Sequence, residues 1–135
     1  MQNNNPIKSF KDIEVYQTTY KIMLVVMKEV ITKLPENEKY DLKDQLSRAC
    51  KSIPRLIAEG YAKRHQKAGF QKYLDDAMAE SNEMIVSLEQ AKDLYNIEPV
   101  TINMKELVDL YDKSARQLYN LSMAWTNFKN KNDKR

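Results

Sequence analysis

The chain has 135 residues, which suits a single domain large enough to bury a core. Only 2 glycines and 4 prolines occur, and a β-sandwich or β-barrel draws on both for its many turns, so the count argues against those folds. The net charge is only +3, but basic residues concentrate between Arg48 and Lys72 and acidic residues between Tyr73 and Lys113. This segregation indicates a charged face that meets a partner, or complementary faces that meet in an oligomer.

The first predicted helix follows a polar arm. Residues 1–8 are polar and are expected to be flexible. Ser9 is placed to cap a helix, and Asp12 favours its positive end. Apolar residues then recur every three or four positions, which is typical of one face of a helix: Ile13, Tyr16, Tyr20, Leu24, Met27, Ile31 and Leu34. Leu34-Pro35 is expected to end this helix.

The second predicted helix begins after Asp41, a plausible cap. Its apolar face comprises Leu42, Leu46, Ala49, Ile53, Leu56 or Ile57, and Gly60. Pro54 lies inside this pattern and predicts a kink, because proline lacks an N–H and clashes with the carbonyl four residues earlier. Gly60 predicts either the end of the helix or the close approach of another backbone.

Two further helices complete the chain. The third is expected to start near Gln66, and its apolar face repeats without a break: Phe70, Leu74, Ala77, Ser81, Met84, Leu88, Ala91 and Tyr95. The connection over 96–100 precedes a fourth helix capped by Thr101 or Asn103. The face of this helix comprises Leu107, Tyr111, Ser114, Leu118, Leu121, Trp125 and Phe128. The polar residues after Phe128 are expected to fray.

Helices joined by such short connections are expected to pack against one another in alternating directions. The sequence therefore predicts an all-α fold, an antiparallel up-down-up-down four-helix bundle over residues 9–128, with a flexible N-terminal arm (1–8) and a basic C-terminal tail (129–135). No apolar stretch approaches the ~20 residues that span a bilayer, so no membrane partner is expected. The lone Cys50 and the polar start of the chain, which shows no signal peptide, favour a cytoplasmic protein.

Several motifs resemble those of the four-helix-bundle proteins encoded in 23S rRNA intervening sequences. The opening Phe10-Lys11-Asp12-Ile13 with Val15-Tyr16-Gln17 is similar to the start of that family. The second helix is similar to its most specific signature, through Arg48-Ala49, Ser52-Ile53-Pro54 and Ile57-Ala58-Glu59-Gly60-Tyr61. Leu56 stands where the family usually has asparagine, and Ser47 where it has a second arginine, which puts in doubt any partner contact those residues make.

The resemblance carries expectations about assembly and partners. It implies a four-helix bundle that forms a homo-oligomer, typically a pentameric ring. It also implies kinship with the accessory proteins of diversity-generating retroelements, which are basic pentamers that bind a reverse transcriptase and nucleic acid. A reverse transcriptase is thus one partner that the resemblance suggests.

The sequence offers few means of catalysis. His65 is the only histidine, so a ferritin-like di-iron site with its paired Glu-x-x-His motifs is excluded. One cysteine and two distant glycines exclude zinc clusters and glycine-rich nucleotide-binding loops. Cys50 and His65 are too far apart along the helix to act as a nucleophile and its base. The chain is therefore predicted not to be an enzyme and to need no cofactor.

The basic segment is the candidate functional site. On a helical wheel Arg48, Lys51 and Arg55 point about 150° away from the apolar face of the second helix. The following turn is also basic, and the candidate nucleic-acid-binding residues are Arg48, Lys51, Arg55, Lys63, Arg64, His65 and Lys67. Tyr61 lies among them and could stack on a base. This surface predicts a scaffold that binds RNA or DNA. There are two alternatives. Either the charges form an ordinary solvated helix face, or the protein is an adaptor whose basic face meets an acidic partner or a neighbouring subunit.

Other apolar residues fall outside the chosen faces: Val15, Ile22, Val26, Val30, Met78, Ile85 and Leu94. They widen the apolar arc beyond what one bundle needs. Two interpretations remain open. Either they form a second buried face for an oligomer or partner, or some of them belong to the bundle core.

Overall fold

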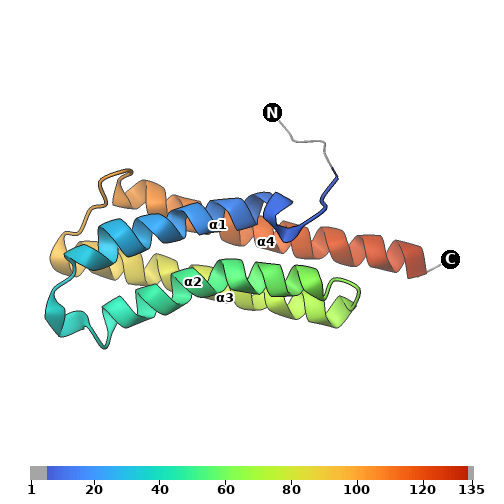
Figure 1. Cartoon of the computed structure of the whole chain (residues 1–135), viewed down its shortest axis with the longest axis horizontal. Helices are drawn as coiled ribbons and strands as arrows, with labels where there is room; N and C mark the ends of the chain where they lie inside the picture. Colours follow the sequence, from blue (N-terminus) through green and yellow to red (C-terminus); the bar gives the residue numbers. More distant parts are fainter. Residues whose placement is uncertain (1–5, 134–135) are drawn as a thin grey trace.

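The computed structural model describes residues 6–133, without the side chains of Lys67 and of residues 126–133. Its main elements are α1 (Glu14–Val25), α2 (Leu42–Ala62), α3 (Lys67–Tyr95) and α4 (Met104–Asp133). Helices α1 and α4 lie on one side and α2 and α3 on the other, and successive helices run in opposite directions (Figure 1). The prediction of an antiparallel up-down-up-down four-helix bundle is confirmed.

The predicted domain limits fall only partly on the described residues. Residues 6–8 precede the first helical turn, and α4 continues as one helix to Asp133, beyond the predicted end of the bundle at residue 128. Residues 1–5 and 134–135 lie outside the described residues. The division into arm, bundle and tail therefore stays a prediction. Within the described residues, no helix is long and apolar enough to cross a bilayer.

The chain enters the bundle through a short 3-10 turn, η1 (Phe10–Asp12). The Ser9 hydroxyl accepts a hydrogen bond from the backbone N–H of Lys11 (3.2 Å), and the Asp12 carboxylate accepts one from the N–H of Ser9 (3.0 Å). This reciprocal cap confirms the predicted role of Ser9. Ile13 is then extended, so the chain changes direction before α1 begins, and the Phe10 ring comes to lie beside Tyr16.

The predicted inner face of the first helix is wrong by about one residue. Tyr20 and Leu24, assigned to the core, are 46% and 37% exposed, whereas Val15, Ile22, Val26 and Val30 are buried. Thr19 occupies the remaining position on the true inner face and is 1% exposed. Its hydroxyl can be buried because it donates to the carbonyl of Val15 (2.8 Å). A threonine in this row concealed the inner face from a search for apolar residues alone.

The first helix also changes its winding before it ends. A π-helical turn, η2 (Val26–Val30), follows α1, and a 3-10 turn, η3 (Ile31–Lys33), follows η2. Buried residues are four apart here, at Ile22, Val26, Val30 and Leu34. In an α-helix, side chains four residues apart differ in direction by about 40°, so a row with this spacing would gradually turn away from the core. A π turn has more residues per turn and brings the row back toward the core. Leu34 is extended and ends the segment, as predicted.

Helix α2 buries the predicted face, with Ile57 rather than Leu56 at the alternative position. The helix is continuous through Pro54. Gly60 permits a close helix crossing, because a Cβ there would stand 3.1 Å from the Cβ of Tyr73 on α3. Asp41 occupies the N-cap position of α2 as predicted, but its side chain makes no capping bond. Glu38, in the 3-10 turn η4 (Glu36–Glu38), accepts from the N–H of Leu42 instead (3.3 Å).

Helices α3 and α4 bury most of their predicted faces; Tyr95, Leu121 and Trp125 are partly buried. The Phe128 side chain lies outside the described residues. Asn103, not Thr101, caps α4, since its side chain accepts from the N–H of Glu106 (2.8 Å). Thr101 instead donates to Glu29 of the π turn, which also accepts from the N–H of Val100 (2.8 Å) and so ties the α3–α4 connection to the first helix.

Most of the extra apolar residues belong to the bundle core or pack against it. Val15, Ile22, Val26 and Val30 belong to the bundle core, and Met78 and Ile85 pack partly against it. Leu94 is 66% exposed. The apolar side chains left on the surface of α1 are therefore Tyr20 and Leu24, which the sequence pattern had placed inside.

Candidate nucleic-acid interface

Helix α2 turns the predicted cations away from the core. Arg48 and Arg55 are exposed and Lys51 is half-buried, while Leu46, Ala49 and Ile53 on the opposite side are buried. This arrangement follows from their spacing of three and four residues. The charges are nevertheless not equivalent, because their neighbours differ.

The charge of Arg48 is opposed by carboxylates of the same chain. Its Nε lies 3.0 Å from the Asp44 carboxylate, one turn earlier on α2. Glu80 of α3 is also close to Arg48. Burial and the nearby Glu83 raise the pKa of the Glu80 carboxyl overall, and the charge of Arg48 has a smaller, opposite effect that lowers it. Both members of the Arg48–Asp44 pair are largely exposed, so the pair contributes little to stability. Among the candidates on α2, Arg48 is the one least available to an anion.

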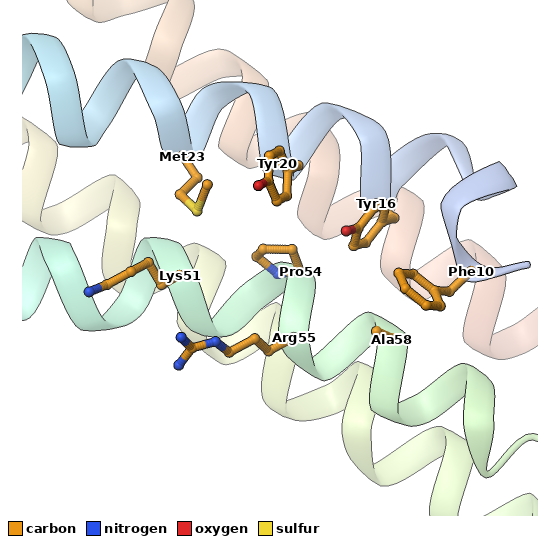
Figure 2. A pocket seen from close by; sticks show the side chains of 8 residues that line it. All are labelled: Phe10, Tyr16, Tyr20, Met23, Lys51, Pro54, Arg55 and Ala58. Atoms are coloured by element: carbon orange, nitrogen blue, oxygen red, sulfur yellow. The ribbon is translucent and has the colours of Figure 1, made fainter.

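Lys51 and Arg55 have no carboxylate within 4 Å in the described part of the chain. Their aliphatic stems form one wall of a groove of about 360 Å³ between α1 and α2. The other lining residues are Phe10, Tyr16, Tyr20, Met23, Pro54 and Ala58. In Figure 2 the aromatic rings follow α1, and the charged ends of Lys51 and Arg55 extend away from them. The charged ends of the two cations thus lie at the edge of an aromatic groove, on the side away from the rings.

The turn after α2 holds Arg64 in a structural role. Its guanidinium lies 3.9 Å from the centre of the Tyr61 ring and donates to the Tyr61 carbonyl (2.7 Å). The Arg64 carbonyl in turn accepts from the indole N–H of Trp125 on α4 (3.0 Å). One face of Tyr61, which the sequence offered as a stacking platform, is therefore covered by Arg64. These contacts tie the α2–α3 turn to α4 at Trp125.

The remaining cations of the turn are placed differently. The Lys63 ammonium is exposed and lies 5.5 Å from the centre of the Tyr73 ring, a distance that suits a cation–π contact. His65 is exposed. The Lys67 side chain lies outside the described residues. Glu59, which the sequence offered as a partner for Arg55 or Lys63, pairs with neither in the described structure. Of the candidate lysines and arginines whose side chains are described, Lys51, Arg55 and Lys63 therefore have neither a carboxylate partner nor a side-chain hydrogen bond, whereas Arg48 and Arg64 do.

The structure gives Cys50 no features of a nucleophile. Its side chain is fully buried, and burial raises the pKa of the thiol to about 12. His65 is exposed in the turn after α2. Within the described residues, no three of the histidine, cysteine, aspartate and glutamate side chains are grouped so as to hold a metal ion.

The sequence interpretation missed the groove itself. Tyr16 and Tyr20 were assigned to the core, and Phe10 was given no place on a helix face, yet together they form the wall of the groove on the side of η1 and α1. One signal was present in the sequence. The basic residues of α2 alternate with Pro54 and Ala58, whose short side chains leave room for aromatic rings of the adjacent helix. The missing information was which side of α1 faces α2.

Comparison with known proteins gives one family. The family model described as 23S rRNA-intervening sequence protein matches residues 11–120, which includes all of α1, α2 and α3 and the first half of α4. No curated protein and no solved structure matches the chain.

Proposed function

Since this chain belongs to the 23S rRNA-intervening sequence protein family, we propose that it is a non-catalytic scaffold or accessory protein that binds RNA or DNA. The contact surface is formed by Lys51, Arg55 and Lys63, here called the α2 basic surface. Arg64, His65 and Lys67 lie in the adjoining turn. We propose further that the protein acts as a homo-oligomer, in which each subunit would repeat this surface and raise the total affinity for a long polyanion.

The proposal rests on three cations whose charges are not paired with a carboxylate in the described part of the chain. Lys51, Arg55 and Lys63 have no carboxylate partner in the described structure, whereas Arg48 and Lys72 each lie within 3.4 Å of an aspartate on the same helix. A phosphate approaching the α2 basic surface therefore breaks no existing ion pair. It gains the free energy of releasing the counterions condensed on the nucleic acid.

The test is binding of a fluorescently labelled RNA of about 30 nucleotides at about 25 mM and 150 mM salt. The variant Lys51→Gln/Arg55→Gln/Lys63→Gln should bind roughly tenfold more weakly or worse at low salt. Its matched control, Lys28→Gln/Lys105→Gln/Lys113→Gln, changes exposed lysines on other elements and lowers the net charge from +3 to 0 in the same way. Absence of any complex at low salt, or an equal loss in both variants, would contradict the proposal.

A second candidate is a protein adaptor whose basic face meets an acidic surface. One such surface is present on the molecule itself, because α3 exposes Asp75, Asp76, Glu83, Glu89 and Asp93. Opposite charges on two helices of one subunit suit head-to-tail contacts in a ring, where the acidic helix of one copy meets the basic helix of the next. Under this proposal the charge reversal Lys51→Glu/Arg55→Glu lowers the mass measured by light scattering. Under the nucleic-acid proposal the mass stays the same and only RNA binding falls.

A further inference from the structure

We propose that the groove between α1 and α2 receives an unpaired nucleobase, so that the preferred ligand is a single strand rather than a duplex. In this arrangement the base lies against Tyr20, and the neighbouring phosphates meet Lys51 and Arg55. This inference rests on the proposed function and adds the class of nucleic acid to it.

A row of aromatic rings forms the α1 wall. The centres of the Phe10 and Tyr16 rings are 5.0 Å apart, and those of Tyr16 and Tyr20 are 6.0 Å apart. Tyr20 ends this row and is 46% exposed, so part of its ring is available. Aromatic side chains of this kind bind single strands without regard to sequence, because every base has a π face. The Ser9–Asp12 cap holds Phe10 at the other end of the row.

The opposite wall provides space and charge. Pro54 and Ala58 are short side chains, and Figure 2 shows Pro54 across the groove from Tyr20. The groove of about 360 Å³ lies within the range of small-ligand sites. None of its lining residues is acidic. Lys51 and Arg55 stand one turn apart at its edge with their charged ends directed away from the rings, where the sugar–phosphate chain of an inserted base would pass.

Charge complementarity favours this occupant over a second copy of the chain. The centre of a subunit interface is normally depleted of charged residues, and lysine in particular is disfavoured there. Here Lys51 lies in the groove wall beside Arg55, so a second copy could cover the groove only by bringing acidic residues of its own to both cations and burying the pairs. A polyanion with flat apolar bases satisfies the cations and the rings together. A duplex presents its phosphates but keeps its base faces stacked inside, so it satisfies only the cations.

The experiment compares a labelled single strand of about 12 nucleotides with a duplex of the same sequence at about 25 mM salt, by fluorescence anisotropy. Wild-type protein should bind the single strand several-fold more tightly. Tyr20→Leu should weaken single-strand binding roughly tenfold and leave duplex binding unchanged. Tyr20→Trp should restore it, since a tryptophan ring also stacks. The control Tyr119→Leu alters another exposed tyrosine, 55% exposed on α4, and should have no effect.

The outcomes separate the two proposals. If a complex forms but single strand and duplex bind equally, and Tyr20→Leu behaves like Tyr119→Leu, the groove proposal is overturned while the α2 basic surface stands. If neither ligand binds at low salt, both proposals fail. If Tyr20→Leu lowers the mass measured by light scattering, the groove is covered by a second copy and the proposal is overturned.

Discussion

Removing the hydroxyl of Tyr111 should stabilise the protein. Tyr111 is fully buried in the core, and its hydroxyl has no hydrogen-bond partner in the described structure. Burial, and to a lesser degree the nearby Cys50, raise the pKa of this group well above the usual value, which keeps it neutral. A buried polar group without a partner costs about 1–3 kcal/mol of desolvation. The substitution Tyr111→Phe removes that cost.

The magnitude follows from two opposing effects. Loss of one oxygen leaves a void of roughly 12 Å³, which costs about 0.3 kcal/mol. At the lower end of the desolvation range, the free energy of unfolding should therefore rise by about 0.7 kcal/mol. For a chain of this size that corresponds to a rise in Tm of about 3 °C.

Urea unfolding followed by circular dichroism measures this effect. The midpoint should rise for Tyr111→Phe while the slope m stays unchanged. Two variants with the same chemical change serve as controls. Tyr119→Phe alters an exposed residue and should change the stability by less than about 0.5 kcal/mol. Tyr95→Phe removes the hydrogen bond that Tyr95 donates to Glu38 and should lower the midpoint. A fall in stability for Tyr111→Phe similar to that for Tyr95→Phe would show that the buried hydroxyl has a partner and would refute the reasoning.

Two further predictions concern the helix crossing and the α3–α4 connection. Gly60→Ala should lower the free energy of unfolding by about 1 kcal/mol, because its Cβ would stand 3.1 Å from the Cβ of Tyr73 and both helices would have to shift. Gly69→Ala would place its Cβ 3.3 Å from the flexible end of the Gln66 side chain and no nearer than 3.5 Å to the Cβ atoms of Gln66 and Lys63, so it should stabilise α3 by up to about 1 kcal/mol. Equal effects of the two substitutions in urea unfolding would contradict this account. Hydrogen bonds from Thr101 and Val100 lower the pKa of Glu29 below its usual 4.5, so the stability that this carboxylate contributes is present at neutral pH and is lost as the pH falls through the lowered pKa. Glu29→Gln should therefore unfold at lower urea than wild type at pH 7, with a difference that narrows near pH 3; a difference independent of pH would contradict the assignment.

The sequence correctly predicted the buried face of a helix where a single row of regularly spaced apolar residues is also the row that packs into the core. The inner face of α3 was correct because its heptad repeat is unbroken from Phe70 to Ala91, and Ser81, its one polar member before Tyr95, is buried with its hydroxyl on the Ala77 carbonyl. The first helix was misassigned because two apolar rows one residue apart compete there. The row that is buried contains Thr19, and the row that is exposed contains Tyr20.

The candidate site was predictable in its location but not in its detail. The Asp44–Arg48 pair follows from a spacing of four on one helix and could have been anticipated. The contact of Arg64 with Tyr61 and the Trp125 indole depends on side-chain rotamers and on the approach of α4, which the sequence pattern does not specify. The groove depends on which face of α1 meets α2, so an error in that face concealed it.

The salt dependence of binding tests the central claim most directly, because it counts the phosphates that the protein neutralises. For a single strand the slope of log Kobs against log salt changes by about 0.7 for each phosphate contact. We predict that Lys51→Gln/Arg55→Gln/Lys63→Gln makes this slope shallower by about 2, while Lys28→Gln/Lys105→Gln/Lys113→Gln leaves it unchanged. An unchanged slope in the first variant, or the same change in both, would contradict the claim that the α2 basic surface holds the nucleic acid.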